Sequence, residues 1–438
     1  MSTPTRSHSM LRMEPFLFLV GMFVCFMDIP NIPVGGVHLK MPQLVFPLYM
    51  PLLLLRYKFR VKKHLTVLGA LFLSFLLPSV LFSTNIKISL EYLYAAVISV
   101  IIMNSMYRLA TQMGSETVEL MLWFYRWTVI TTVPLVAFRL QERGHYTLYE
   151  ASYWAIALIP YYCISFNRLF DQGRNAFLWD GLIIVLALVT SSSVSMAIWI
   201  VISFLFVAFA KGRLTIKTIV TSGAVIIFLL VGAWIASDRV QSLFQIIADA
   251  RDWSALPMLL VAAGGNRLQR ILIAYRAFVE HPIVGVGPGA LLDFASLHYR
   301  ASDFSIGGMA ASDFNTDLPA TNAFLELAAE AGIIGFAAFL TLLWFVLRRS
   351  AGKPPISPFR ISVVVTMLSL TIESSYLRPY VWMLYGITLG LSDACCSDAL
   401  DHGSLKRILA RVIYREDRNK PSAVAGCPPL SKGDSGIL

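Results

Sequence analysis

Long apolar runs separated by short polar segments make up most of this 438-residue chain. A helix that crosses a bilayer needs about 20 predominantly apolar residues, and the runs predict an all-α fold, a polytopic bundle of about 12 transmembrane helices. The predicted spans begin near Glu14, Pro42, Leu65, Leu90, Val118, Tyr153, Ala176, Ser195, Ile216, Ala323, Ile361 and Val381. The pattern is ambiguous near Leu90, near Tyr153 and at 191–193, so eleven or thirteen spans remain open.

One polar segment, 237–321, is much longer than the others. Within it, 267–280 is predicted to be an amphipathic helix that Pro282 ends, because proline cannot continue a helix. Its expected apolar face consists of Leu268, Ile271, Leu272, Tyr275, Phe278 and Val279. Glycines at 285, 287 and 289 predict a turn-rich stretch, and the acidic stretch 301–318 is expected to be a mobile loop.

The chain therefore divides into four expected regions. Residues 1–236 hold transmembrane helices 1–9, and 237–321 form one large extracytoplasmic loop that contains amphipathic helices. Residues 322–394 hold transmembrane helices 10–12, and 395–438 form a cytoplasmic tail that is expected to be partly disordered.

Composition and charge support a membrane protein. Only 14% of the residues are charged, against about a quarter in soluble domains, and the mean hydropathy is +0.67. This excludes a soluble enzyme with a single anchor. The net charge of +10 does not indicate a nucleic-acid partner, because the basic residues lie in short clusters between apolar runs. Of the 36 Lys and Arg, 24 fall in alternate segments, which predicts that both termini are cytoplasmic.

Cysteine and histidine usage gives no sign of a metal or disulfide framework. None of the five cysteines lies in the long loop, and His281 and His298 are isolated. We therefore expect no metal and no cofactor. The first apolar run lacks a small-residue cleavage site, so we expect it to be an uncleaved span.

Two short segments carry a family resemblance. The first is Arg267 followed, fifteen residues later, by the turn Pro282-Ile283-Val284-Gly285-Val286-Gly287. The second is Thr321-Asn322-Ala323-Phe324-Leu325-Glu326-Leu327, which continues through Glu330 and Gly332 to Gly335. The pair resembles the O-antigen ligase and polymerase family of membrane glycosyltransferases. That family shows an Arg, a helix and Pro-x-x-Gly-x-Gly, and then His-Asn-x-x-Leu-x-x-x-x-Glu-x-Gly-x-x-Gly after its outer loop.

The resemblance implies an inverting, metal-independent transfer of glycan from an undecaprenyl-diphosphate carrier to an acceptor hydroxyl. In ligases the acceptor is the lipid A-core of lipopolysaccharide, and in polymerases it is another repeat unit. The implied partners are the lipid-linked oligosaccharide, the acceptor glycan, membrane lipids, and chain-length regulator or export proteins. The implied location is the bacterial inner membrane.

The chain departs from the family pattern at two positions. Thr321 stands where ligases carry a His that is thought to serve the acceptor hydroxyl, and a Thr hydroxyl cannot act as a base near neutral pH. The mid-chain Arg of many members is absent from 190–195. Both departures favour a polymerase of exopolysaccharide or O-antigen repeat units over a ligase, and leave a non-catalytic member open.

Three arginines are candidates to bind the diphosphate, because guanidinium groups stay charged and grip phosphate oxygens in pairs. Arg267 matches the family motif, and Arg270 lies one turn further along the same predicted helix. Arg126 lies inside an apolar span, where a charge usually marks a site. The alternatives are lipid-headgroup contact for the first two, and a structural ion pair with Glu119 or Glu91 for Arg126.

Asn322 and Glu326 are the candidates on the acceptor side. They are four residues apart and so share one face of the predicted helix, together with Glu330. Glu326 is a candidate catalytic base for the acceptor hydroxyl, and Asn322 is a candidate to cap the helix or to orient the acceptor. The alternative for Glu326 is a solvated carboxylate favoured by the helix dipole.

Two other classes fit the same topology. A polysaccharide-related secondary transporter or flippase also has about 12 spans, but such proteins show two repeated halves, which this sequence does not. A non-catalytic scaffold in a glycan export complex is the third possibility.

Overall fold

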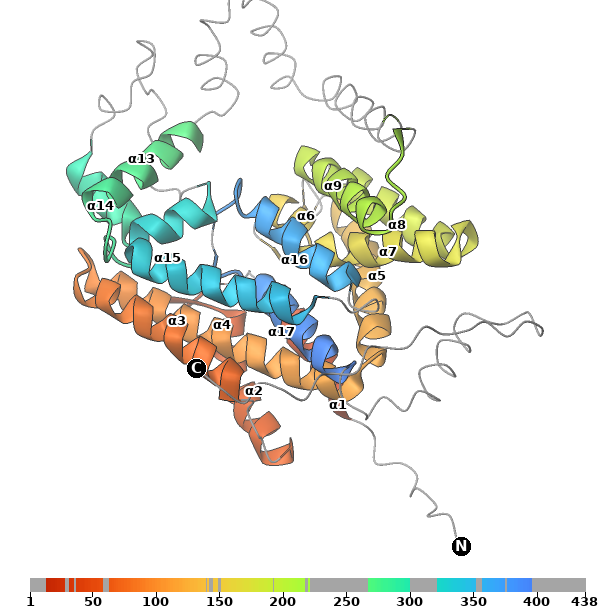
Figure 1. Ribbon diagram of the computed structural model, residues 1–438, viewed down its shortest axis with the longest axis horizontal. Helices are drawn as coiled ribbons and strands as arrows, with labels where there is room; N and C mark the ends of the chain where they lie inside the picture. The colour runs from red at the N-terminus through yellow and green to blue at the C-terminus, as the bar shows by residue number, and fades with distance from the viewer. Residues whose placement is uncertain are drawn as a thin grey trace, which may run out of the picture. The chain divides into compact units, whose positions relative to one another are not determined.

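The structure, a computed structural model, describes residues 13–27, 31–34, 37–57, 63–138, 140–141, 145–148, 151–191, 193–216, 220, 267–299, 321–351, 357–374 and 376–395 (Figure 1). The acidic stretch 301–318 and the tail from 396 onward lie outside these residues. The expected span near Ile216 also lies outside them, except at 216 and 220.

The described residues are mainly helical. The first half contains α1 (Met13–Cys25), the strands β1 (Asn31–Val34) and β2 (Val37–Lys40), α2 (Met41–Tyr57), α3 (Lys63–Leu81), α4 (Ile86–Met113), α5 (Glu116–Ala137), α6 (Ala151–Ala157), α7 (Ile159–Gln172), α8 (Arg174–Ser191) and α9 (Val194–Ala210). The second half contains α13 (Arg267–Glu280), α14 (Leu291–His298), α15 (Ala323–Arg349), α16 (Ser357–Ser369) and α17 (Pro379–Ala394). The two strands form an antiparallel hairpin in which Asn31 pairs with Lys40.

The expected all-α class is confirmed, and several helices are fit to cross a membrane. In the described part of the chain, α4, α5, α8 and α15 are long and apolar enough to span a bilayer. Shorter apolar helices occupy five more of the expected span positions, at 13–25, 41–53, 65–81, 194–210 and 357–369. The total of twelve spans stays a prediction.

The expected span near Tyr153 is interrupted. Helix α6 ends at Ala157 and α7 begins at Ile159, with Pro160 in the first turn of the new helix. Proline fits that position, because a first-turn residue needs no backbone N–H partner within the helix.

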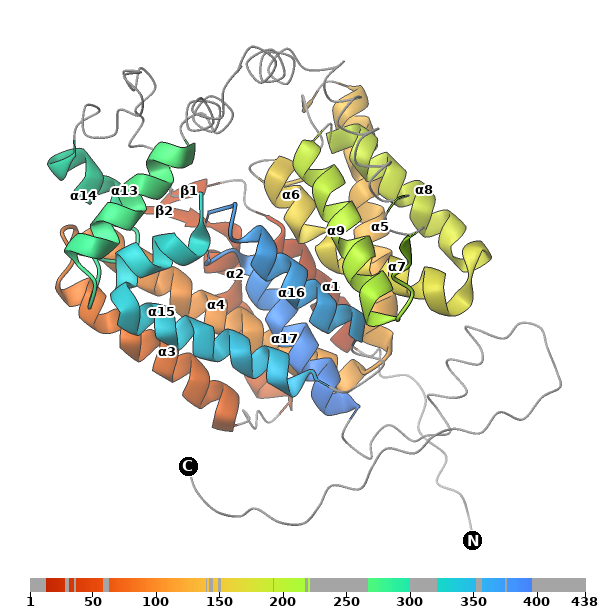
Figure 2. The same ribbon diagram turned by 45° about the horizontal axis from the view of Figure 1, so that its top comes forward.

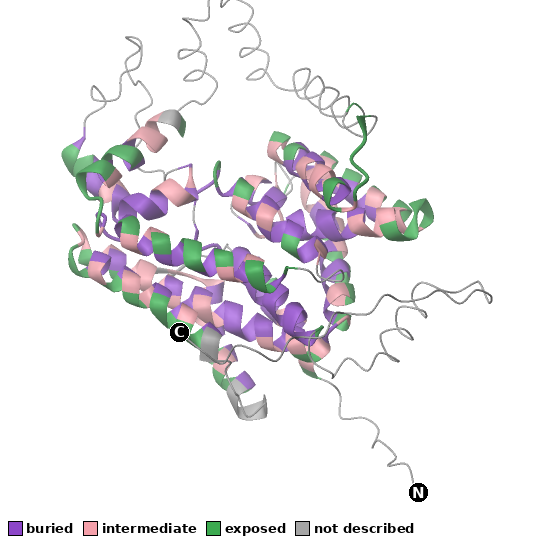
Figure 3. Ribbon diagram, viewed as in Figure 1, coloured by how far each residue is buried: buried purple, intermediate pink, exposed green. Residues whose placement is uncertain are grey.

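Large apolar side chains cover the outward faces of several helices. Leu48 on α2 is 74% exposed, and Trp123 on α5, Leu178 on α8 and Phe209 on α9 are also exposed. Figure 3 shows such exposed positions along α3 and α8, with buried positions concentrated in α4, α15 and α17. Exposed apolar surface of this extent is expected where the solvent is lipid.

Among the described helices, α4 and α17 have the most extensive contact. A Cβ added at Gly386 would lie 2.3 Å from the carbonyl oxygen of Met103, and one at Gly390 would lie 2.4 Å from that of Tyr107. Small residues four apart allow backbones to approach in this way. Polar contacts fix the same pair, because the Tyr107 hydroxyl donates to Asp393 at 2.6 Å. Arg349 of α15 also pairs with Asp393, at 3.4 Å.

We expect Gly386→Ala to destabilise the protein by about 1–3 kcal/mol, because the new methyl group meets backbone that cannot rotate away. Gly181→Ala in α8 is the matched control, since its nearest neighbour is the Phe177 side chain at 3.0 Å. Thermal unfolding in detergent compares the two. Equal unfolding temperatures would contradict the proposed close contact.

Candidate functional site

Helix α15 is broken at Gly332, and the segment 281–289, here called the glycine turn, supplies partners at the break. Gly332 has φ 63 and ψ −172 inside the helix. The N–H of Ile333 donates to the carbonyl of Pro282 at 2.8 Å. In return, the carbonyls of Ala329 and Glu330 accept from Val286 and Gly287 at 3.0 and 2.9 Å. The two motif segments therefore form one unit through their backbones.

Two glycines make this contact possible. A Cβ at Gly285 would lie 2.3 Å from the Glu330 carbonyl oxygen, and one at Gly332 would lie 2.1 Å from that of Ile283. Both residues also have positive φ, 71° and 63°, which side-chain-bearing residues rarely adopt. Gly332 therefore serves to break α15, and the spacing of the motif glycines follows from backbone contact.

The other side of the glycine turn packs on the beginning of α4. Thr84 N–H donates to the Val286 carbonyl at 3.2 Å, and the Ser89 hydroxyl donates to the Pro288 carbonyl at 2.9 Å. A hydrogen bond from the Asn85 amide to Asp293 ties α14 to the same point. The turn is thus held between α4 and α15.

Helix α13 has the predicted bounds, but its buried face differs from the expected one. Ile273, Ala274 and Ala277 are buried in a cluster with α14 and α15, while Tyr275 and Val279 are more than half exposed. The expected face was wrong at these two positions. Small alanines let α13 approach α15 closely, and this packing depends on the partner helix, not on periodicity alone.

The ends of the two motifs also meet. The Thr321 hydroxyl donates to the backbone carbonyl of Arg267 at 3.3 Å. The Arg267 side chain is exposed at the first turn of α13, and Arg270 is half-buried one turn further on. The structure therefore places Arg267 beside the start of α15, as the motif pair requires.

Asn322 is the N-cap of α15. Its side-chain oxygen accepts from the N–H of Leu325 at 2.9 Å, so capping accounts for this residue in the protein as described. The following N–H, of Ala323, donates to the carbonyls of Leu370 and Glu373 at 2.9 and 3.0 Å. These bonds attach the start of α15 to the segment between α16 and α17. A role of Asn322 toward an acceptor stays a prediction.

Glu326 and Glu330 are both buried, each with 2% of its surface exposed. The alternative of a solvated carboxylate at a helix end is therefore wrong for Glu326. Glu330 hydrogen-bonds the backbone of Gly289 and accepts from the Tyr376 hydroxyl at 3.4 Å. Burial raises the pKa of the Tyr376 phenol well above its usual value, and the charge of Glu330 raises it further. Tyr376 thus keeps its proton and acts as a donor.

Arg126 lies in a separate buried cluster. Its Nε and Nη2 lie 2.8 and 2.7 Å from Oδ1 of Asp180, a residue with no exposed surface. Arg168 reaches the other oxygen at 3.3 Å, and the Tyr161 hydroxyl donates to Oδ1 at 3.0 Å. The ion pair expected as an alternative for Arg126 is present, with Asp180 as the partner in place of Glu119 or Glu91. In Figures 1 and 2, α16 lies between α5, the helix that carries Arg126, and α13, the helix that begins at Arg267.

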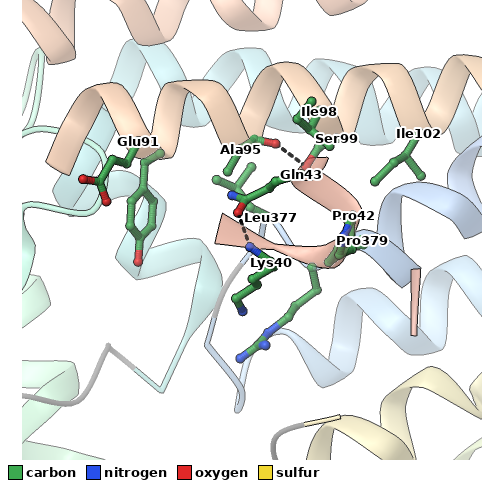
Figure 4. Close-up of a pocket in the computed structure, with 12 residues that line it drawn as sticks. Lys40, Pro42, Gln43, Glu91, Ala95, Ile98, Ser99, Ile102, Leu377 and Pro379 are labelled. Atoms are coloured by element: carbon green, nitrogen blue, oxygen red, sulfur yellow. Dashed lines mark hydrogen bonds between the residues drawn. The ribbon is translucent and has the colours of Figure 1, made fainter. Parts of the chain in front are cut away.

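A cavity of about 270 Å³ lies between the beginning of α2, α4 and the beginning of α17 (Figure 4). Its lining consists of Lys40, Pro42, Gln43, Glu91, Tyr92, Ala95, Ile98, Ser99, Ile102, Leu377, Arg378 and Pro379. The cavity adjoins the glycine turn, because a Cβ at Gly289 would touch the Tyr92 ring at 2.2 Å. Sequence reasoning did not find Lys40 or Tyr92, since both lie far from the motifs along the chain. Among the described residues, no group of His, Cys, Asp and Glu is arranged to hold a metal ion.

Comparison with known families agrees with this geometry. Residues 176–340 match the family model described as O-antigen ligase. This part of the chain is O-antigen ligase-like. The matched region includes Arg267, the glycine turn and the first half of α15, whereas α4 and α17 lie outside it. No curated protein matches the chain. Members of that family are glycosyltransferase-like ligases and polymerases that act on polyprenyl-linked glycans, and the match supports an enzyme in general.

We expect Gly332→Ala to destabilise the protein by more than the roughly 1–3 kcal/mol of backbone strain alone, because it adds a clash with Ile283. Gly212→Ala is a matched control, since Gly212 has nearly the same φ, 62°, and nothing within 4 Å of an added Cβ. Thermal unfolding measures the difference. Equal losses of stability in the two variants would mean that the glycine turn moves to accommodate the new methyl group.

We expect Asp180→Ala to destabilise the protein by about 3–5 kcal/mol, because it leaves two arginines without their buried counter-ion. Asp171→Ala removes an exposed ion pair with Lys211 and should cost less than about 1 kcal/mol. Chemical or thermal unfolding of both variants tests this. A small loss in Asp180→Ala would show that the cluster is not structural.

Proposed function

We propose that the protein is a polymerase that transfers a growing glycan from undecaprenyl-diphosphate to the acceptor hydroxyl of another repeat unit of an exopolysaccharide or O antigen. One observation carries the proposal. The two motif segments, which are separated along the chain, form a single unit in which the turn of one supplies the backbone partners of a broken helix in the other. The O-antigen ligase match over both segments supports the same reaction class.

In the proposed reaction, the acceptor oxygen attacks the anomeric carbon while the bond from that carbon to the diphosphate breaks, and the configuration inverts. Arg267 and Arg270 would bind the diphosphate and stabilise its growing charge. Glu326, buried one turn from Asn322, would take the proton of the acceptor hydroxyl. Asn322 would hold the start of the helix that carries Glu326 and line the acceptor side. Arg126 would act only indirectly, because Asp180 already pairs with it.

The acceptor side favours a polymerase over a lipid A-core ligase. Thr321 replaces the ligase His, and its hydroxyl donates to the Arg267 carbonyl. It holds the two motifs together and cannot accept a proton near neutral pH. Glu326 and Glu330 are the carboxylates next in line on α15, and Glu330 already bonds Gly289 and Tyr376. We assign the proton-accepting role to Glu326, the buried carboxylate one turn after Asn322.

The test is the set of lipid-linked glycans in a deletion strain. We expect single repeat units to accumulate on the carrier, because polymerisation stops while synthesis continues. Wild-type protein should restore long chains, and Arg267→Ala should reduce them by at least 100-fold, on the order of the loss of one transition-state contact. Arg276→Ala on the same helix should complement fully, since Arg276 pairs with Glu280 on the exposed side of α13 and lies over the Tyr299 ring.

Other outcomes point elsewhere. Long carrier-linked chains together with uncapped lipopolysaccharide core would identify a ligase in spite of Thr321. Unchanged glycans in the deletion strain would contradict the proposed enzyme.

A further inference from the structure

A diphosphate leaving group builds up negative charge, and fixed cations beyond the two motif arginines would stabilise it further. Arg267 is exposed, Arg270 lies one turn away on the same helix, and the mid-chain Arg of the family is missing. Arg126 does not replace it, because Arg126 and Arg168 both hold Asp180. Two further cations, Lys40 and Arg378, line the cavity beside the glycine turn.

Arg378 is held in place before any substrate binds. It has 8% of its surface exposed, and its guanidinium carbon lies 3.7 Å from the centre of the Tyr153 ring. Its backbone carbonyl accepts from Val381 in the first turn of α17 at 3.0 Å. The Tyr153 hydroxyl in turn lies 3.2 Å from the Ser374 hydroxyl. A guanidinium that is stacked on an aromatic ring is already ordered, so little side-chain entropy is left to lose when its N–H groups bond an anion.

Lys40 is held by the beginning of α2. The backbone N–H of Lys40 donates to the side-chain oxygen of Gln43 at 2.7 Å. The backbone carbonyl of Gln43 accepts from the Tyr94 hydroxyl of α4 at 2.7 Å. Figure 4 shows Lys40 and Gln43 on the same side of the cavity, below the helix that carries Glu91. The hairpin and the last helix thus bring one cation each to a single cavity.

Carboxylates lie near these cations, as the reaction requires. Glu91 lines the same cavity. Tyr92 lines the cavity as well, and it lies within electrostatic reach of Glu330 and Glu326 as well as of Arg378 and Glu91. A displacement at one carbon needs a proton acceptor and leaving-group cations within a few ångströms of each other. The volume of about 270 Å³ suits one small polar group and is too small for a lipid or an oligosaccharide.

We propose that this cavity is an anion subsite in which Lys40 and Arg378 bind the diphosphate of the carrier lipid. The inference rests on the proposed function for the identity of the anion. The same cationic chemistry would also take the carboxylate of an acidic sugar, and the experiment separates the two sources.

The test is thermal unfolding of the purified full-length protein in detergent, with inorganic diphosphate, with glucuronate and with glucose as a neutral sugar. We expect diphosphate to raise the unfolding temperature of the wild type by a few degrees, because a ligand that binds the folded state stabilises it. The shift should disappear in Lys40→Gln and in Arg378→Gln. It should persist in Lys87→Gln, an exposed lysine at the beginning of α4.

Three results would overturn the proposal. These are no shift in the wild type, a shift that survives Lys40→Gln, or a shift with glucuronate but not with diphosphate, which would make this an acidic-sugar subsite. If Arg378→Gln fails to fold, Lys40→Gln and the charge-retaining Arg378→Lys, which should keep a weaker shift, decide the question. If diphosphate binding depends on Lys40 but the deletion strain has normal glycans, the site stands and the proposed function fails.

Discussion

The site depends on one exchange of backbone hydrogen bonds. Gly332 interrupts α15, and the N–H and carbonyl groups that the interruption involves are bonded by Pro282, Val286 and Gly287. In an apolar environment, an unsatisfied backbone group costs several kcal/mol, so the broken helix and the turn stabilise each other. The part of α15 before Gly332, which carries Asn322, Glu326 and Glu330, is thereby separated by a break from the part after it.

Two sets of charged residues in this apolar chain lie in contrasting environments. Asp180 is surrounded by Arg126, Arg168 and Tyr161, and these residues supply the ion pairs and the hydrogen bond that its buried carboxylate needs. Such a cluster fixes α5, α7 and α8 relative to one another. Lys40, Glu91 and Arg378 instead border a cavity next to the glycine turn. The first environment is a structural element, and the second, which borders a cavity, is the candidate site.

The sequence was sufficient to predict the helices and their bounds, but not to predict which residues of different helices contact each other. The bounds of α13 could be predicted, because amphipathic spacing and Pro282 act within a few residues. Its buried face could not be predicted in full, since α14 and α15 decide which side of the helix is covered. The pairing of Arg126 with Asp180 was also beyond reach, because the two residues are 54 positions apart and lie on different helices.

By itself, the sequence determined a helical membrane protein with two motif segments that resemble those of O-antigen ligases and polymerases, since hydropathy, proline and glycine act locally. The tertiary structure decided that these segments share one set of backbone hydrogen bonds, that Glu326 is buried and not solvated, and that Lys40 and Arg378 border the same cavity. These are contacts between residues that are far apart along the chain. Their formation depends on how α4, α15 and α17 pack, and no local pattern in the sequence encodes that packing.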